Sequence, residues 1–173
     1  MSPPLTFGVE FECSFAVLKA GRKNPNPLER RKVNFEENVV PALTIGNDIK
    51  NVLGAAGYPV TVDKVNIETW EVTDDSTIHP PDMTAHPELD AYSWVGIEIK
   101  SSAMYAVEGS FKAITDVLAI LTSTYCINVN ESTGLHVHVG DGAYKGFSFD
   151  TARKLAAFFC TYLPPHPTLP KYS

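Results

Sequence analysis

Apolar residues recur along the chain with two spacings, every second residue in some segments and every third or fourth in others. These spacings predict strands and helices in alternation. Apolar and polar residues alternate from Phe7 to Phe15, which is the period of a half-buried strand. Between Val107 and Thr124, apolar residues recur at steps of three and four, which predicts the clearest helix of the chain. Shorter strands are predicted at Val60–Lys64, Ile67–Thr73, Trp94–Ser101, Tyr125–Val129 and Leu135–Val139.

Proline, glycine and serine predict where two further helices begin and end. A helix is expected to open near Pro41 and to end at Gly54 or Gly57, since proline suits the first helical turn and glycine the end. Ser148 is expected to cap the last helix. The apolar residues of that helix are Leu155, Phe158, Phe159, Tyr162 and Leu163.

The connecting segments complete the predicted fold. Residues 21–34 and 77–92 are rich in proline and charge and are expected to be loops, and Asn66 lies near a turn between two short strands. The resulting order is one strand, a helix, three strands, a helix, two strands and a helix. This order predicts one α+β domain over residues 1–173, with a mostly antiparallel sheet and helices on one face.

Composition and charge narrow the class of protein. The chain has 173 residues, 44% hydrophobic and 20% charged, and a formal net charge of -6, which disfavours nucleic acid or an anionic membrane as partner. No apolar run approaches the length of about 20 residues that spans a bilayer, and the N-terminus lacks the pattern of a signal peptide. Three widely spaced cysteines argue against a disulfide framework. We therefore expect a cytoplasmic protein with reduced thiols.

The polar positions of three predicted strands carry metal-ligand residue types. In "FGVEFE", Glu10 and Glu12 point away from the face that Phe7, Val9 and Phe11 share. Glu98 alternates with isoleucines in "GIEIK", and His136 and His138 alternate with apolar residues in "GLHVHVG". If the three strands lie in one sheet with aligned faces, these five side chains converge on one surface.

Such a surface has two interpretations. Each motif alone is typical of the wet face of a half-exposed strand, where polar residues alternate outward. Together they predict a site in which a divalent cation neutralises the repulsion between carboxylates. A set of mostly oxygen donors with one or two imidazoles suits Mg²⁺ or Mn²⁺ better than structural Zn²⁺.

Four motifs resemble those of the amidoligase family. They are "FGVEFE", "WEVTDDS" (Trp70–Ser76), "GIEIKS" (Gly96–Ser101) and "NESTGLHVHVG" (Asn130–Gly140), and they match the family in order and spacing. The resemblance covers Phe7 to about Leu163. It implies a fold like that of glutamine synthetase and γ-glutamylcysteine synthetase. It also implies an ATP-dependent ligase that joins a small-molecule or peptide carboxylate to an amine through an acyl phosphate.

The resemblance also implies roles for single residues. Glu10, Glu12, Glu98 and His136 would hold divalent metal, and His138 would approach the ATP phosphates. Asp74 and Ser76 match the family's D-x-S pattern and would line the catalytic site, while Asn130 and Gly134 would belong to the loop on the substrate side. Lys100 departs from the family's usual Glu-Ile-Val-Ser-Pro, and it could pair with a carboxylate or touch phosphate.

The resemblance leaves two alternatives to an active ligase. Family members generally continue past the last helix to an arginine segment and a further strand, so the chain is expected to be a C-terminally truncated form of the family domain. One alternative is therefore a non-catalytic remnant of this fold. The other is a metal-dependent hydrolase that uses His136, His138 and carboxylates around an activated water and needs no ATP.

Overall fold

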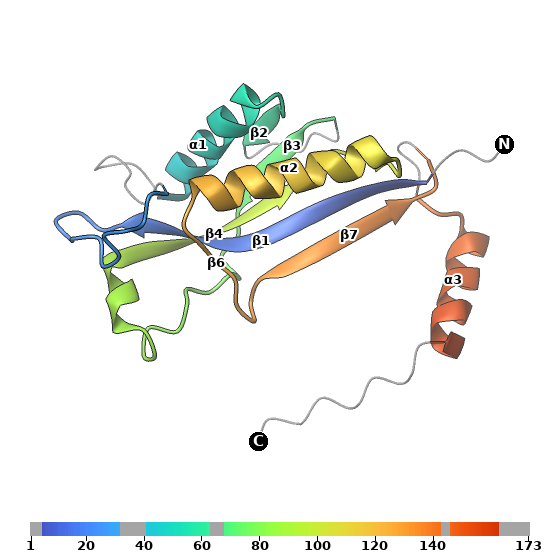
Figure 1. Ribbon diagram of the computed structural model, residues 1–173. Helices are drawn as coiled ribbons and strands as arrows, with labels where there is room; N and C mark the ends of the chain where they lie inside the picture. The colour runs from blue at the N-terminus through green and yellow to red at the C-terminus, as the bar shows by residue number, and fades with distance from the viewer. Residues whose placement is uncertain (1–4, 32–40, 63–67, 143–145, 163–173) are drawn as a thin grey trace, which may run out of the picture.

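The computed structural model describes residues 5–31, 41–62, 68–142 and 146–162. Within them the chain forms an α+β fold with one mixed, mostly antiparallel sheet (Figure 1). The strands are β1 (Thr6–Leu18), β2 (Val60–Val62), β3 (Trp70–Asp74), β4 (Tyr92–Lys100), β5 (Met104–Tyr105), β6 (Ile127–Asn128) and β7 (Gly134–Gly140). The helices are α1 (Pro41–Ala55), the 3₁₀ helix η1 (Pro87–Ala91), α2 (Glu108–Thr124) and α3 (Phe149–Tyr162).

Strand β1 is the centre of the sheet. It pairs antiparallel with β4 along one side, where β5 continues the pairing, and antiparallel with β6 and β7 along the other. Strand β3 lies outside β4, and β2 pairs with β3 in parallel. The predicted antiparallel sheet is confirmed for every described pair except this one. Asn66, the predicted turn residue, lies outside the described residues.

Helices α1 and α2 cover one face of the sheet, and the core lies between this face and the two helices (Figure 1). The alternation predicted for β1 is confirmed, because Phe7, Val9 and Phe11 are all buried. Their partners in the core are Val72, Ile97 and Ile99 from the strands and Ile45, Ile49, Leu53, Val117 and Leu121 from the helices. Removal of these apolar surfaces from water is the main stabilisation of the arrangement.

The backbone confirms the predicted end of α1 and the predicted start of α3. Helix α1 is described from Pro41, and Gly57 ends its last turn with φ +90°, a conformation that favours glycine. The Tyr58 N–H donates to the Leu53 carbonyl across that turn. At α3, the Thr151 N–H donates to Ser148 Oγ at 3.2 Å, as expected of a serine cap.

Several boundaries differ from the prediction. Strand β1 continues to Leu18, and β5 was not predicted. The expected loop 77–92 contains η1 and ends where β4 begins, at Tyr92. No helix in the described part of the chain is long and apolar enough to cross a bilayer.

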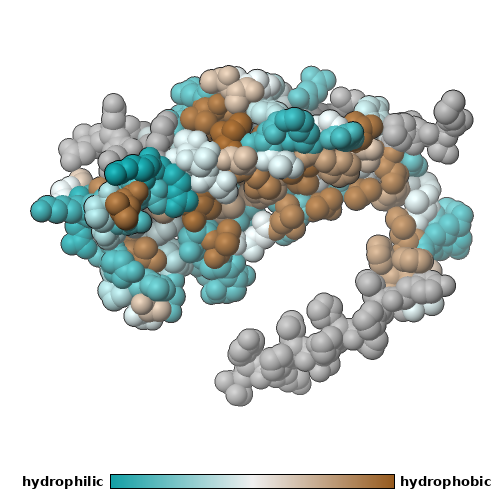
Figure 2. Space-filling model, viewed as in Figure 1, coloured by the Kyte–Doolittle hydropathy of each residue, from teal (hydrophilic) through white to brown (hydrophobic). Residues whose placement is uncertain are grey.

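The apolar residues of β7 and α3 are not buried as the pattern predicts. Leu135, Val137 and Val139 of β7 are all at least half exposed, and so are Phe158 and Phe159 of α3. Helix α3 lies beyond the end of β7 and not over the face that α1 and α2 cover (Figure 1). In Figure 2, apolar surface is open along the side where β7 lies.

Candidate functional site

The pairing register places the predicted carboxylates and imidazoles on one face of the sheet. Glu12 lies directly opposite Glu98 of β4, and Glu10 lies opposite His136 of β7. His138 lies opposite Gly8, two residues before Glu10 on β1. Because directly opposite residues point to the same face, the predicted convergence of these five side chains is confirmed. They occupy the face opposite to the one that α1 and α2 cover, and we call the surface formed by Glu10, Glu12, Glu98, His136 and His138 the carboxylate face.

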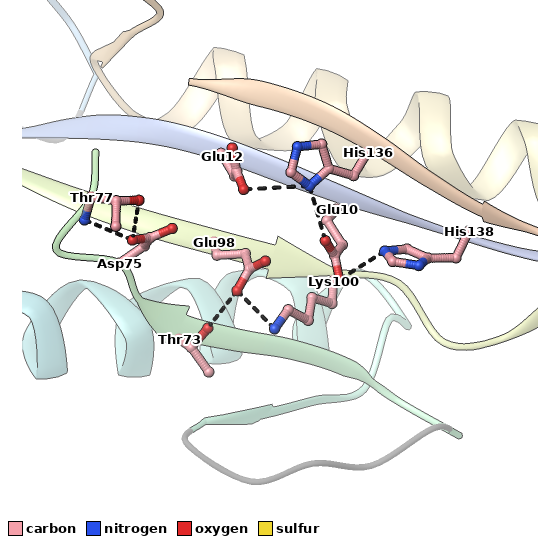
Figure 3. Close-up of polar contacts among 9 residues, drawn as sticks. All are labelled: Glu10, Glu12, Thr73, Asp75, Thr77, Glu98, Lys100, His136 and His138. Atoms are coloured by element: carbon pink, nitrogen blue, oxygen red, sulfur yellow. Dashed lines mark hydrogen bonds and ion pairs between the residues drawn. The ribbon is translucent and has the colours of Figure 1, made fainter. Parts of the chain in front are cut away.

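The two histidines contact the carboxylates of β1 (Figure 3). His136 Nδ1 lies 3.3 Å from Glu10 Oε2 and 3.5 Å from Glu12 Oε1, and His138 Nε2 lies 3.2 Å from Glu10 Oε1. Burial raises the pKa of Glu10, but hydrogen bonds with His138 and His136 oppose it and bring the pKa below its ordinary value. Glu10 therefore favours its charged form at neutral pH.

Lys100 and Thr73 hold the carboxylate of Glu98. Lys100 Nζ lies 2.7 Å from Glu98 Oε2, and Thr73 Oγ1 donates to the same oxygen at 3.3 Å (Figure 3). The hydrogen bond to Glu98 raises the pKa of Lys100. Of the two expectations for Lys100, pairing with a carboxylate is confirmed.

Glu71 is a further acidic residue of this face that the sequence analysis missed. It lies opposite Lys100, so Glu71, Lys100, Glu10 and His136 form one row across four adjacent strands. Glu71 is buried. The signal was present in the sequence, since Glu71 alternates with the apolar Trp70 and Val72 just as Glu10 alternates with Val9 and Phe11.

Gly134 leaves room for two of the functional side chains. It lies opposite Glu12, and a Cβ on it would come within 2.9 Å of Glu12 Oε2 and 3.3 Å of His136 Nε2. A side chain at this position would therefore compete with the carboxylate and the imidazole for the same space.

The structure does not bring Asp74 to the carboxylate face. Asp74 lies opposite Ile97, whose side chain is in the core, so Asp74 is on the helix side of the sheet. Asp74 and Ser76 line an open pocket of about 330 Å³ together with Ala42 of α1 and Trp94 of β4. Their predicted catalytic roles stay predictions.

Asn130 has a structural role in the turn before β7. Its Nδ2 donates to the His79 carbonyl at 3.0 Å, and its Oδ1 accepts hydrogen bonds from Ser132 N and Oγ. The His79 N–H donates to Ser132 Oγ, which ties the loop after β3 to the same turn. Asn130 thus helps to position the strand that carries the histidines, and its predicted catalytic role remains open to test.

The side chains of the carboxylate face are of the types that coordinate a hard divalent cation. Three carboxylates of adjacent strands and one imidazole offer mainly oxygen ligands. Within the described residues, no group of three or more His, Cys, Asp or Glu side chains has the arrangement of an assembled metal site. Imidazole nitrogens and Lys100 Nζ contact the carboxylates instead. A cation would therefore have to displace these contacts, and the two histidines are more than half exposed.

Comparisons with known proteins identify the family. Neither the comparison with curated proteins nor the one with solved structures gives a match. A family model described as "Putative amidoligase enzyme" matches residues 3–162, which includes every strand and helix of the described structure. The chain therefore belongs to the amidoligase family.

Proposed function

We propose that the protein is an ATP- and divalent-metal-dependent carboxylate–amine ligase that works through an acyl phosphate. One observation carries the proposal beyond the family assignment. Glu12 and Glu98 lie directly opposite each other with Glu10 beside them, and like charges so placed repel unless cationic groups lie among them. In the structure Lys100 and His136 take that place. A bound divalent cation would turn that repulsion into attraction.

The residues of the carboxylate face divide into two roles in this proposal. Glu10, Glu12, Glu98 and His136 would hold Mg²⁺ or Mn²⁺, which would neutralise charge on the phosphate oxygens of ATP. His138 and Lys100, at the border of the carboxylates, would contact phosphate. Asp74 and Ser76 at the end of β3 and Asn130 in the turn before β7 are outside these two sets, and they would act on the carboxylate and amine substrates.

The proposed reaction has two steps. An oxygen of the substrate carboxylate attacks the γ-phosphorus of ATP, and ADP leaves with the bonding electrons. The nitrogen of the amine then attacks the carbonyl carbon of the acyl phosphate, phosphate leaves, and the amine nitrogen loses a proton. In such phosphoryl transfer, the protein acts mainly by positioning and by electrostatic stabilisation.

Calorimetric titration with a non-hydrolysable ATP analogue tests the proposal. We expect binding to the wild-type chain in the presence of Mg²⁺ and none without it. The double variant Glu10→Ala/Glu12→Ala should lose this binding. Glu88→Ala serves as the matched control, because Glu88 lies in η1 and is not one of the residues assigned to the carboxylate face. Its titration should equal that of the wild type.

The remaining outcomes separate the alternatives. Binding of the analogue that needs no metal, or that survives in the double variant, would contradict the proposed site. Metal binding without nucleotide binding would favour a metal-dependent hydrolase. If the wild-type chain binds neither, a non-catalytic member of the family is the better interpretation.

A further inference from the structure

One face of β7 exposes apolar side chains that an element of the fold should cover. Leu135, Val137 and Val139 are 61%, 56% and 50% exposed, whereas Phe11, Val9 and Phe7, their respective partners on β1, are at most 9% exposed. Helices α1 and α2 cover β1 and the strands on its other side but stop short of β7 (Figure 1). An apolar sheet face next to the core is stable when another element buries it.

The exposed surface continues from β7 onto α2. Phe111 is 53% exposed and stacks on Phe7, which lies opposite Val139. Leu118 is 38% exposed and lies two turns further along the same side of α2. We call the surface formed by Leu135, Val137, Val139, Phe111 and Leu118 the apolar patch. Figure 2 shows hydrophobic surface along this side of the molecule.

Helix α3 has the complementary surface. Leu155, Phe158 and Phe159 follow the spacing of one helix face, and Phe158 and Phe159 are 54% and 51% exposed. On the other side of the helix, Asp150 pairs with both Arg153 and Lys154. The helix is thus amphipathic, yet about half of the surface of each phenylalanine is exposed, and the helix lies beyond the end of β7 instead of over its apolar face (Figure 1).

We propose that α3 folds back along β7 and packs its apolar face on the apolar patch. The lengths agree, since seven residues of strand and 14 residues of helix both span roughly 20 Å. Residues 141–148 connect the two elements and can extend over about 25 Å, which exceeds the spacing of about 10 Å between packed layers. A helix that returns in this way runs antiparallel to β7, so Phe159 approaches Leu135.

Docking of α3 on β7 would help to hold the two histidines of the functional site in position. His136 and His138 are on the opposite face of the same strand, which pairs with only one other strand in the described structure. A helix packed on its apolar face would hold the strand, and with it both imidazoles, against β1. The inference does not depend on the proposed ligase activity, because it rests only on the packing of apolar surfaces.

Thiol labelling at Val137→Cys tests the inference. The rate of reaction with a charged maleimide is read at this residue by peptide mass spectrometry, while light scattering gives the mass of the particle. The Val137→Cys variant is compared with two variants that carry a further pair of substitutions in α3. One pair is Phe158→Ser/Phe159→Ser on its apolar face, and the other is Arg153→Ser/Lys154→Ser on its polar face. If α3 covers β7, only the substitution of the two phenylalanines should speed labelling. When nine molecules in ten are docked, complete undocking raises the labelling rate by about tenfold.

A second comparison does not depend on the folding of the α3 variants. Val129→Cys reports an open position, since Val129 is 70% exposed, and residue 137 should react about tenfold more slowly than residue 129 in the monomer. Equal rates at the two positions would overturn the inference. Slow labelling at residue 137 in a particle of twice the chain mass would also overturn it, because a second copy would then be the cover.

Discussion

At the scale of single residues, the carboxylate face is explained by what lies opposite each glutamate. Glu10 and Glu12 are two residues apart on one strand, which by itself predicts repulsion. The structure places His136 between them and Lys100 opposite Glu10. The two glutamates thus have cationic or polar neighbours that the local sequence of β1 does not contain.

The space beside Gly134 leads to a prediction about binding. In Gly134→Ala the new Cβ would meet Glu12 Oε2 and His136 Nε2. Because these are ends of flexible side chains, we expect the free energy of unfolding to change by less than about 1 kcal/mol. Metal-dependent nucleotide binding should weaken by roughly 10- to 100-fold, since small displacements of positioning groups are costly.

Calorimetry and urea unfolding of Gly134→Ala would check both expectations. Gly54→Ala is the control, because nothing lies within 4 Å of a Cβ at this helical position. It should leave binding unchanged and stabilise the chain by up to about 1 kcal/mol. Unimpaired binding in Gly134→Ala would show that the two side chains have room elsewhere.

Glu29 offers a prediction about pH dependence. Hydrogen bonds from Arg31 lower the pKa of Glu29 to about 2. A lowered pKa stabilises the folded state fully above the ordinary pKa of 4.5 and loses this contribution as pH falls toward 2. Glu29→Gln should therefore lower the free energy of unfolding at pH 6, and the difference should shrink below pH 4.5. Since Arg31 is 35% exposed, the effect at pH 6 should be at most about 1 kcal/mol.

Urea unfolding at pH 6 and at pH 3 measures this difference. The same substitution in an Arg31→Met background provides the control, because the pair is then already absent and the second change should add little. A difference that stays constant with pH would mean that the effect of Glu29→Gln does not come from its charge.

At the scale of elements, the strands and helices with a clear period were predicted, as were the positions of the short strands β2 and β6, whereas β5 was missed. The alternation in β1, β4 and β7 and the period of α2 predicted elements that the structure confirms within a few residues. Strand β5 has two residues, too few to show a period. The parallel pairing of β2 with β3 depends on how the chain returns to the sheet, which no local pattern records.

The contact between α1 and the end of α2 gives a prediction about stability. Tyr125 directly follows α2 and is 1% exposed, and its hydroxyl donates to Asp48 Oδ2 of α1 at 2.6 Å. Tyr125→Phe should lower the free energy of unfolding by about 1.5–3 kcal/mol, as expected for a hydrogen bond to a charged group. Tyr105→Phe is the control at a 46% exposed position, where we expect a change below about 0.5 kcal/mol. Similar losses in both variants, measured by urea unfolding, would argue against a special role for the Tyr125–Asp48 contact.

At the scale of the whole molecule, the site depends on the order of strands in the sheet. Glu10 and Glu12, Glu98, and His136 and His138 come from three strands that are distant in sequence and adjacent in space. Binding across three strands should stabilise the folded chain as a unit, because a ligand that binds only the folded state raises its stability.

Thermal unfolding tests this linkage. Mg²⁺ with an ATP analogue at 100 times the dissociation constant should add about 2.7 kcal/mol, which corresponds to a rise in melting temperature of roughly 5–10 °C for a chain of this size. Neither component alone should give the full rise. Glu10→Ala/Glu12→Ala should show no rise, and an undiminished rise in that variant would mean that the ligand binds elsewhere.

The sequence by itself determined the main strands and helices, the polar faces of β1, β4 and β7, and the identity of five residues on the carboxylate face. These follow from periods that any strand or helix imposes on its own residues. Only the tertiary structure decided that Asp74 faces the helices, that Glu71 lies in one row with Lys100, Glu10 and His136, and that the apolar side of β7 is open. These depend on which strands are neighbours and which elements cover them. Such relations join residues far apart in the chain, so local patterns do not contain them.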